Sequence, residues 1–315
     1  METCARIARS DSVVGVVVEA DPLSSWGPTS MFLSRLLASF TLAILLLPSV
    51  ALGGKKPLQE GDEKFEYHFT DTALDGAELK IEVSKAHTQR DFALATARFE
   101  NKSGDYLLLH KEQILFRFDF GDRAVKGGKA GKPVVIAPGG KKKLSLKVTG
   151  SGEFESVRAF SLQFDALQRV ASKGEAVKVP EFQLPASVNS FEAGPFSCSL
   201  KGKVTQETDL TKAKFLCTYN GEQVGFIDPT RVALRIPSGQ EFANTNNKAK
   251  RKLLQSGDKM PVVVSYVVER KVVDMQFAIL QLDWRDAFSE SPAVPMAVGG
   301  VELSYDADKT IDHNN

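Results

Sequence analysis

The side chains with the clearest potential for binding chemistry are basic residues gathered in two loop segments. The chain carries no acidic residue from position 124 to position 152. Charges of one sign on neighbouring loops attract ligands of the opposite sign, so these segments could bind an anionic polymer such as lipopolysaccharide or an acidic polysaccharide. The alternative, which we favour, is that the lysines keep a sheet soluble and block edge pairing. The residues are Lys126, Lys129, Lys132, Lys141, Lys142 and Lys143 in the first segment, and Lys248, Lys250, Arg251 and Lys252 in the second.

Two cysteines, Cys198 and Cys217, lie in segments with the composition of β-strands, and the turn-like residues 205–209 lie between them. An antiparallel pair of strands joined at that turn would bring the two sulfur atoms opposite one another. In an oxidising compartment two such cysteines form a disulfide. A metal site is the alternative, but no third or fourth ligand has the spacing that a zinc site requires. We therefore predict a disulfide between these cysteines.

Motifs of catalytic sites are absent from the sequence, including G-x-S-x-G, H-E-x-x-H and the phosphate-binding loop. No histidine lies near a cysteine or a second histidine at ligand spacing, so we expect each to be a surface or turn residue. A catalytic base also needs a placed nucleophile, which the sequence does not offer. We predict a protein that is not an enzyme and has no cofactor or metal site; a hydrolase with carboxylates in a cleft between two domains is the alternative. The histidines are His68, His87, His110 and His313.

An internal repeat determines which elements position these residues. Residues 88–167 recur at residues 205–285, with an offset of 117 to 119 positions. A repeat of this length predicts two domains of like fold, each near the common domain size of about 100–150 residues. The matching residues are Thr88 and Thr205, Asn101 and Asn220, Arg117 and Arg235, Gly121 and Gly239, Gly139 and Gly257, Gln163 and Gln281, and Asp165 and Asp283.

Apolar side chains alternate with polar ones at a period of two, which is typical of β-strands. Ile114, Phe116 and Phe118 show the pattern. Turn sequences rich in glycine, proline and asparagine separate such runs about every 8–12 residues, as in a sandwich of short strands. We therefore predict an all-β protein with two tandem β-sandwich domains and a frayed polar tail. The domains span residues 64–184 and 187–305, a short linker lies at residues 179–186, and the flexible tail covers residues 306–315.

Matching charges occur in both copies, Arg117 with Asp165 and Arg235 with Asp283. They could form a ligand site, but we favour pairs that support the fold, since structural ion pairs are common. Trp284 follows the strand that carries Asp283. We expect it to pack in the core, because a tryptophan buries a large apolar area; a sugar-binding face is the alternative.

Two stretches of the first copy resemble bacterial extracytoplasmic immunoglobulin-like domains. VVIAPGGKKKLSLKVTG, which begins at Val134, is similar to their Pro-Gly turn followed by an alternating late strand. ARFENKSGDYLLL, from Ala97 to Leu109, is similar to their early strand and Asn-rich turn. The second copy departs from the pattern, because residues 255–257 read Gln-Ser-Gly where Pro-Gly would stand. The resemblance implies tandem immunoglobulin-like sandwiches outside the cytoplasm, and it carries over no ligand or catalytic residue.

Residues 31–53 have the three parts of a secretory signal peptide. Arg35 lies near the start, an apolar run extends from Leu36 to Leu47, and small residues follow. The run has 12 residues, and a membrane-spanning helix needs about 20, so we expect cleavage after Ala51 or Gly53 and no membrane span in the mature chain. We interpret residues 1–30 as an upstream extension before the true start. The protein is thus predicted to be secreted or periplasmic.

The charge balance of the predicted mature chain argues against a nucleic-acid binder, whose domain would be strongly basic. Residues 1–53 hold three basic and four acidic side chains, which leaves 40 − 3 = 37 basic and 39 − 4 = 35 acidic residues, a net charge of +2. We expect an exported, non-catalytic protein with a binding or structural role in the cell envelope or extracellular space. Its expected partner is an envelope protein or an anionic polysaccharide, and its oligomeric state stays open.

Overall fold

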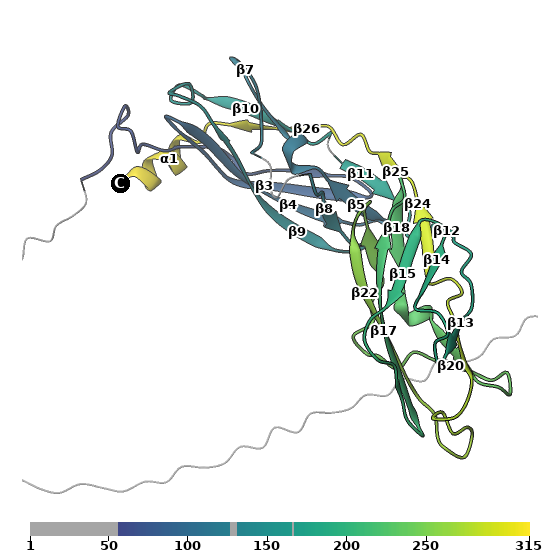
Figure 1. Ribbon diagram of the computed structural model, residues 1–315. Helices are drawn as coiled ribbons and strands as arrows, with labels where there is room; N and C mark the ends of the chain where they lie inside the picture. The colour runs from purple at the N-terminus through teal and green to yellow at the C-terminus, as the bar shows by residue number, and fades with distance from the viewer. Residues whose placement is uncertain (1–55, 127–130, 166) are drawn as a thin grey trace, which may run out of the picture. The chain divides into compact units, whose positions relative to one another are not determined.

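The computed structural model describes residues 56–126, 131–165 and 167–315, and within them almost every element is a β-strand (Figure 1). The predicted all-β class is therefore confirmed. The predicted signal peptide at residues 31–53 and the extension at residues 1–30 lie outside the described residues. Among the described residues, no helix is long and apolar enough to cross a membrane.

The first copy forms two layers of antiparallel strands. One layer has the order β1-β3-β4-β9, with β2 also paired to β3. The second layer consists of two four-stranded sheets, β26-β10-β6-β7 and β25-β11-β5-β8. The strands of the first layer are β1 (Tyr67–His68), β2 (Thr72–Asp75), β3 (Leu79–Gln89), β4 (Phe92–Asn101) and β9 (Lys141–Thr149). Those of the second are β5 (Tyr106–Leu109), β6 (Leu115–Phe118), β7 (Gly121–Ala124), β8 (Val134–Ile136), β10 (Ala159–Gln163), β11 (Leu167–Val170), β25 (Ala293–Pro295) and β26 (Gly300–Ser304), with the 3-10 turn η1 (Lys111–Gln113) between β5 and β6.

The second copy repeats this order. Its first layer has β15 and β16 on one side of β17 and β22 on the other, and its second layer has the sheets β12-β24-β18-β21 and β13-β23-β19-β20. The first-layer strands are β14 (Ser190–Ala193), β15 (Phe196–Leu200), β16 (Thr205–Gln206), β17 (Leu210–Tyr219) and β22 (Lys259–Val267). The second-layer strands are β12 (Glu175–Ala176), β13 (Phe182–Leu184), β18 (Val224–Ile227), β19 (Ala233–Arg235), β20 (Glu241–Ala243), β21 (Lys252–Leu254), β23 (Leu280–Asp283) and β24 (Phe288–Ser291), and η2 (Pro229–Arg231) matches η1.

Each copy buries its own aromatic core between its layers, because alternate side chains of every strand point inward. In the first copy, Phe99 of β4 meets Phe164 edge to face, with ring centroids 5.7 Å apart. In the second, Trp284 is buried against Phe191 and Phe215, each with centroids 5.0 Å from its own. The prediction that Trp284 packs in the core is confirmed.

The disulfide Cys198–Cys217 joins directly opposite residues of β15 and β17, and both cysteines are fully buried. It confirms the predicted pairing. The ladder of the first copy has Ile81 opposite Phe99 at the corresponding place. An apolar pair in one copy and a covalent link in the other therefore fill the same core position.

The register of the repeat shifts near its end. Phe92 pairs with Thr149 and Leu210 with Val267, so these strands share the offset 210 − 92 = 118. In the next hairpin Leu115 pairs with Gln163, and Ala233 pairs with Asp283, so Gln163 corresponds to Asp283 at an offset of 120. The matches of Gln163 with Gln281 and of Asp165 with Asp283 were wrong, because the connection before β23 (residues 268–279) is longer than the one before β10 (residues 150–158).

The C-terminal segment returns to the first copy, so the predicted boundaries of the second domain and of the tail were wrong. β25 pairs with β11 and β26 with β10, where Val301 and Leu303 face the first core (Figure 1). In the second copy, β12 and β13 from the predicted linker take the corresponding edge. The predicted tail forms the helix α1 (Ala307–Asn314), whose buried Thr310 and Asn314 dock it. An open sheet edge has backbone N–H and C=O groups without hydrogen-bond partners. The segments that form β12, β13, β25 and β26 become strands because they supply those partners.

An antiparallel ribbon connects the two copies, and residues 54–315 form one unit. Val170 of β11 pairs with Ala293 of β25. Further along the same two segments of the chain, Ala176 of β12 pairs with Ser289 of β24. A small apolar cluster of Leu108, Val170, Val224 and Phe226 packs at this junction. Gly174 lies where these two segments cross. A β-carbon added to Gly174 would collide with the carbonyl oxygen of Glu290.

We expect Gly174→Ala to lower the free energy of unfolding by about 1–3 kcal/mol, because the added methyl group must push apart two paired backbones. Urea unfolding of the variant and the parent chain would measure the loss. Gly104→Ala is the matched control, since a β-carbon added there would meet no atom within 4 Å, and its effect should stay within about 1 kcal/mol. Equal effects of the two substitutions would contradict the tight crossing.

Candidate anion-binding groove and histidine cluster

A groove on the second copy gathers four lysines without any carboxylate in its lining. Lys212 comes from β17, Lys252 begins β21, and Lys248 and Lys250 lie in the loop between β20 and β21. The groove has a volume of about 530 Å³. All four side chains are exposed, and within the described residues none of them forms an ion pair. Three predicted anion-binding residues, Lys248, Lys250 and Lys252, are thus brought together with a lysine that the sequence did not single out.

Two asparagines hold the groove loop against β22. Asn244 accepts hydrogen bonds from the backbone N–H groups of Ser265 and Asn246, each at 3.0 Å, and its amide donates to the Pro229 carbonyl at 2.9 Å. The Asn246 amide donates to the carbonyl of Val263 at 3.0 Å. Asparagine side chains of this kind replace backbone partners in turns, so the loop that carries Lys248 and Lys250 is fixed before any ligand arrives.

Arg251 lies apart from the groove, although it is adjacent to Lys250 and Lys252 in the sequence. Its guanidinium stacks over the ring of Phe226, 4.3 Å from the centroid, and it reaches the Ser289 hydroxyl at 3.4 Å. Neighbouring residues of an extended chain point to opposite sides, and this side faces the junction between the copies. Arg251 therefore contributes to the packing of the junction and leaves the groove to the lysines.

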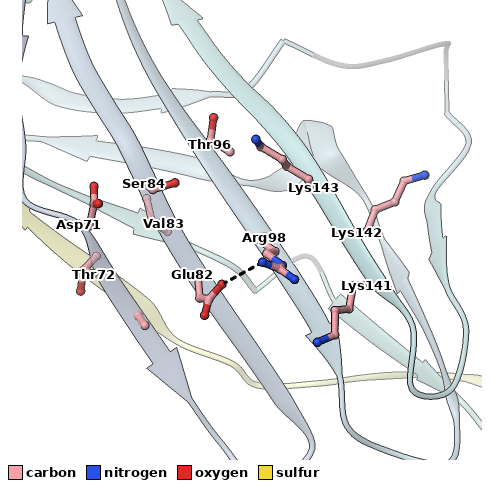
Figure 2. A pocket seen from close by; sticks show the side chains of 11 residues that line it. Asp71, Thr72, Glu82, Val83, Ser84, Thr96, Arg98, Lys141, Lys142 and Lys143 are labelled. Atoms are coloured by element: carbon pink, nitrogen blue, oxygen red, sulfur yellow. Dashed lines mark ion pairs between the residues drawn. The ribbon is translucent and has the colours of Figure 1, made fainter. Parts of the chain in front are cut away.

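The basic residues of the first copy lie among acids. Figure 2 shows Lys141, Lys142 and Lys143 at one side of a pocket of about 720 Å³ that Asp71 and Glu82 also line. The Nζ atom of Lys141 lies 3.0 Å from Glu100, and Arg98 lies 3.9 Å from Glu82. The pocket of the first copy thus carries mixed charge, whereas the charged residues that line the groove of the second copy are all lysines.

The other basic residues of the first loop do not join this pocket. Lys132 pairs with Asp258 of the second copy at 2.6 Å, and Lys126 is exposed. Lys129 lies outside the described residues. Among the described residues, the two predicted basic loops therefore do not combine into one surface.

The arginine that recurs in both copies forms different ion pairs in each of them. Arg235 lies 2.8 Å from Asp283 and 3.1 Å from Glu241, as expected for a pair that supports the fold. Burial raises the pKa of Asp283, but hydrogen bonds from the side chain and backbone of Arg285, with the charges of Arg285 and Arg235, outweigh it and hold this pKa below its usual value. In the first copy Arg117 instead lies 3.5 Å from Asp122, and both side chains are half exposed.

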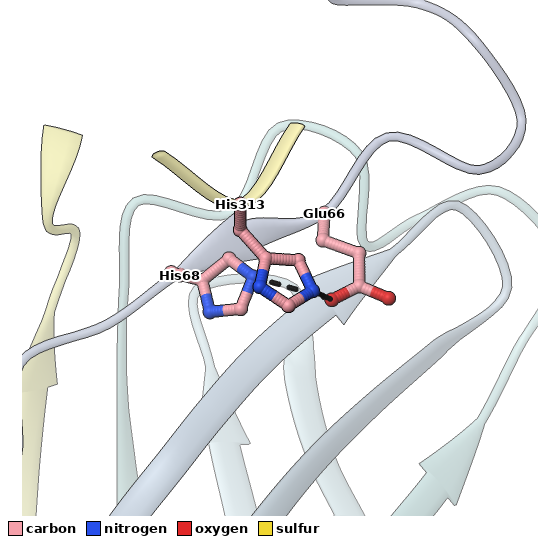
Figure 3. Close-up of side chains that lie close together, drawn as sticks. All are labelled: Glu66, His68 and His313. Atoms are coloured by element: carbon pink, nitrogen blue, oxygen red, sulfur yellow. Dashed lines mark ion pairs between the residues drawn. The ribbon is translucent and has the colours of Figure 1, made fainter. Parts of the chain in front are cut away.

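Three of the four histidines lie around the carboxylate of Glu66, and Figure 3 shows two of them, His68 and His313. The Oε2 atom of Glu66 is 3.2 Å from Nε2 of His68, 3.1 Å from Nε2 of His313 and 4.0 Å from Nε2 of His87. The expectation of isolated histidines was wrong for these three. His68 and His87 face each other across the ladder of β1 and β3, and α1 brings in the third. Only strand pairing and the docked helix reveal the group, because the sequence places its members far apart.

The surroundings orient the side chains of this cluster. Gln89 donates a hydrogen bond from Nε2 to Oε1 of Glu66 at 2.7 Å, and Nδ1 of His87 lies 3.3 Å from the carbonyl oxygen of Lys85. The Nε2 atom of His68 is buried and, although Oε2 of Glu66 lies 3.2 Å away, it makes no hydrogen bond within the described residues. Burial, followed by the charge of His313, lowers the pKa of His68. The fourth histidine of the chain, His110, lies elsewhere and faces Glu112 at 3.5 Å.

Comparisons with known proteins do not assign the chain to a family. No family model matches it, and no curated protein matches it. Among solved structures it is similar to a mutant of the oxalate decarboxylase of Bacillus subtilis, with 12% identity over 72% of this chain and 79% of the other, at a TM-score of 0.17. A conserved protein of unknown function from Pseudomonas aeruginosa PAO1 shows 8% identity over 76% of this chain and 97% of its own, at a TM-score of 0.13. At such TM-scores neither likeness bears on fold or function.

We expect Asp283→Asn to lower the free energy of unfolding at neutral pH by about 1–3 kcal/mol, because it removes charge-assisted hydrogen bonds with Arg235 and Arg285. Because the pKa of Asp283 is lowered in the folded protein, the ionised carboxylate stabilises the fold at every pH above the pKa of the unfolded state, about 3.9. This contribution is lost as the pH falls through the lower pKa of the folded state. Urea unfolding between pH 7 and pH 2 should show the difference between the two proteins shrink below about pH 4.

Asp122→Asn is the control for this experiment, because its carboxylate lies beside Arg117, the counterpart of Arg235, and is half exposed. Its effect should stay below about 1 kcal/mol. A loss at Asp122 as large as that at Asp283, or no acid dependence at Asp283, would contradict the structural role of the second-copy pair.

Proposed function

We propose that this chain is an exported, non-catalytic tandem β-sandwich protein with a binding or structural role in the cell envelope or extracellular space. The observation that carries the proposal is the fully buried disulfide between Cys198 and Cys217, since disulfides persist in oxidising compartments. The signal-like residues 31–53 and the resemblance to extracytoplasmic immunoglobulin-like domains support the same location. The repeated two-layer strand order is in keeping with such domains.

A hydrolase site between the two copies is less well supported. A pocket at the junction is lined by Asp105, Glu175 and Glu290, among others. Glu290, however, accepts a hydrogen bond from the hydroxyl of Tyr219 at 2.6 Å, and Asp105 accepts one from the backbone N–H of Ser172 at 2.9 Å. Two of the three carboxylates therefore hold the junction together, and we do not propose a hydrolase.

Export is tested by fusing residues 31–60 to alkaline phosphatase, which becomes active only after its disulfides form outside the cytoplasm. We expect an active fusion, and loss of most activity with Leu45→Arg, because a charge interrupts the apolar run of the signal. Intact-mass analysis of the protein from the envelope should then show cleavage after Ala51 or Gly53 and a mass lower by two hydrogen atoms for the disulfide. An inactive parent fusion, or reduced cysteines in the exported protein, would overturn the proposal.

The second candidate function is binding of an anionic polymer in the lysine groove of the second copy. The specific observation is a concave surface with four lysines, none of them in an ion pair within the described residues, and no acid in its lining. Such a surface concentrates a potential of one sign, which attracts polyanions. The two asparagines that fix the loop reduce the ordering cost of binding. The mixed charge of the first copy does not offer the same field.

The triple variant Lys248→Gln, Lys250→Gln and Lys252→Gln should bind heparin or lipopolysaccharide at least tenfold more weakly than the parent, a loss of about 1.4 kcal/mol. Its retention on heparin should also depend less on salt, because fewer charges contact the polymer. Isothermal titration and elution in a salt gradient would measure both effects.

The matched control replaces Lys141, Lys142 and Lys143 with glutamine, so that it removes the same number of positive charges, but from the first copy. Its binding should stay within about twofold of the parent, since these residues lie among acids. Equal losses in both variants would show that only net charge matters and would rule out the groove as the binding site.

A further inference from the structure

The cluster of Glu66, His68 and His313 has the donor spacing of a metal site. Its three donor atoms all lie within 4.8 Å of one another, and Glu66 Oε2 is 3.2 and 3.1 Å from the two imidazole nitrogens. Zinc bonds of about 2.0–2.2 Å in a tetrahedron place neighbouring donors roughly 3.3–3.6 Å apart. Small side-chain movements, with no change of the backbone, would therefore bring the three donors to bonding distance of one ion.

The chemistry of the donors selects the class of ion. Imidazole nitrogens with one carboxylate oxygen suit zinc, copper and nickel ions, whereas calcium and magnesium prefer sites made wholly of oxygen. The side chain of His68 is only 13% exposed, and its Nε2 atom, 3.2 Å from Oε2 of Glu66, makes no hydrogen bond within the described residues. A buried polar atom of this kind needs an explanation, and coordination of a cation supplies one.

Neighbouring groups hold the donors in the orientation that a metal needs. Gln89 fixes Oε1 of Glu66 and leaves Oε2 turned toward the histidines. The carbonyl oxygen of Lys85 lies 3.3 Å from Nδ1 of His87, so a proton on Nδ1 can be donated to it while Nε2 keeps its lone pair toward Glu66. Outer partners of this type orient ligands and raise their affinity in known metal sites.

We propose that Glu66, His68 and His313 bind one divalent transition-metal ion of the zinc type, with His87 as the fourth donor. The cluster opens into a pocket of about 650 Å³, which gives the ion a path from solvent. Asp71 and Asp312 line the same pocket, together with Lys85 and Lys309. The site is independent of the lysine groove and of export, so its failure would leave both earlier proposals standing.

The proposed ion would join segments from both ends of the folded chain. His68 belongs to β1, His87 to β3 and His313 to α1. The helix is already docked on β1, because the backbone N–H of His68 donates to the hydroxyl of Thr310 at 2.9 Å and that of Asp306 donates to the carbonyl of His68 at 2.8 Å. Metal binding would therefore also stabilise the returning C-terminal segment.

The test uses the chain from Gly54 to Asn315, which forms a unit separate from the residues before it. After treatment with a chelator, it should bind one zinc ion in isothermal titration, with no competition from calcium. His68→Ala and His313→Ala should each weaken zinc binding by about a hundredfold or more, and Gln89→Leu by about tenfold. Cobalt should give the intense visible absorption of a four-coordinate site, and this band should be lost in both histidine variants.

His110→Ala is the matched control, since this histidine lies outside the cluster, and it should bind zinc as the parent does. His313 is 58% exposed on a terminal helix, so its variant should keep the circular dichroism of the parent even if His68→Ala does not fold. Zinc binding that is unchanged in His313→Ala, equally weakened in His110→Ala, or absent in the parent chain would overturn the proposal.

Discussion

One edge of every second-layer sheet is paired by a strand from outside its own copy, and the rest of the structure depends on this constraint. β25 and β26 cover the edge of the first copy, and β12 and β13 cover the corresponding edge of the second. An uncovered edge would leave a row of unpaired backbone groups and an open template for aggregation. Residues between and after the copies are therefore part of the sandwiches, and the crossing ribbon that they form connects the two cores.

The two copies keep one fold while their chemistry differs. Ile81 and Phe99 fill the core position that the disulfide occupies in the second copy. The lysines of the first copy lie among carboxylates, whereas those of the second line a groove without acids. Ladder pairing constrains the backbone in both copies and leaves outward side chains free to change. A binding site on one copy is therefore determined by the side chains of its own surface. Its presence does not imply a matching site on the other copy.

The sequence predicted what depends on local pattern and missed what depends on distant pairing. Alternating apolar residues predicted the strands, and a turn between two strand-like segments predicted the disulfide. Residues 300–304 were assigned to the second domain and residues 306–315 to a frayed tail, but β26 pairs with β10 of the first copy and α1 follows it. His68 and His87 lie opposite one another because β1 pairs with β3. Neither the register of that ladder nor the position of a terminal helix can be read from residue spacing.

The histidine cluster and the returning strand depend on each other through the backbone. β26 leads through Tyr305, which bridges to Phe69, directly into α1. The imidazole of His313 can therefore reach Glu66 only when β26 is paired with β10 and the helix is docked. A ligand that binds only this arrangement stabilises it by mass action. An ion at the cluster would thus favour the chain in which the first sandwich is closed, and it would couple metal occupancy to the integrity of the edge on which the fold depends.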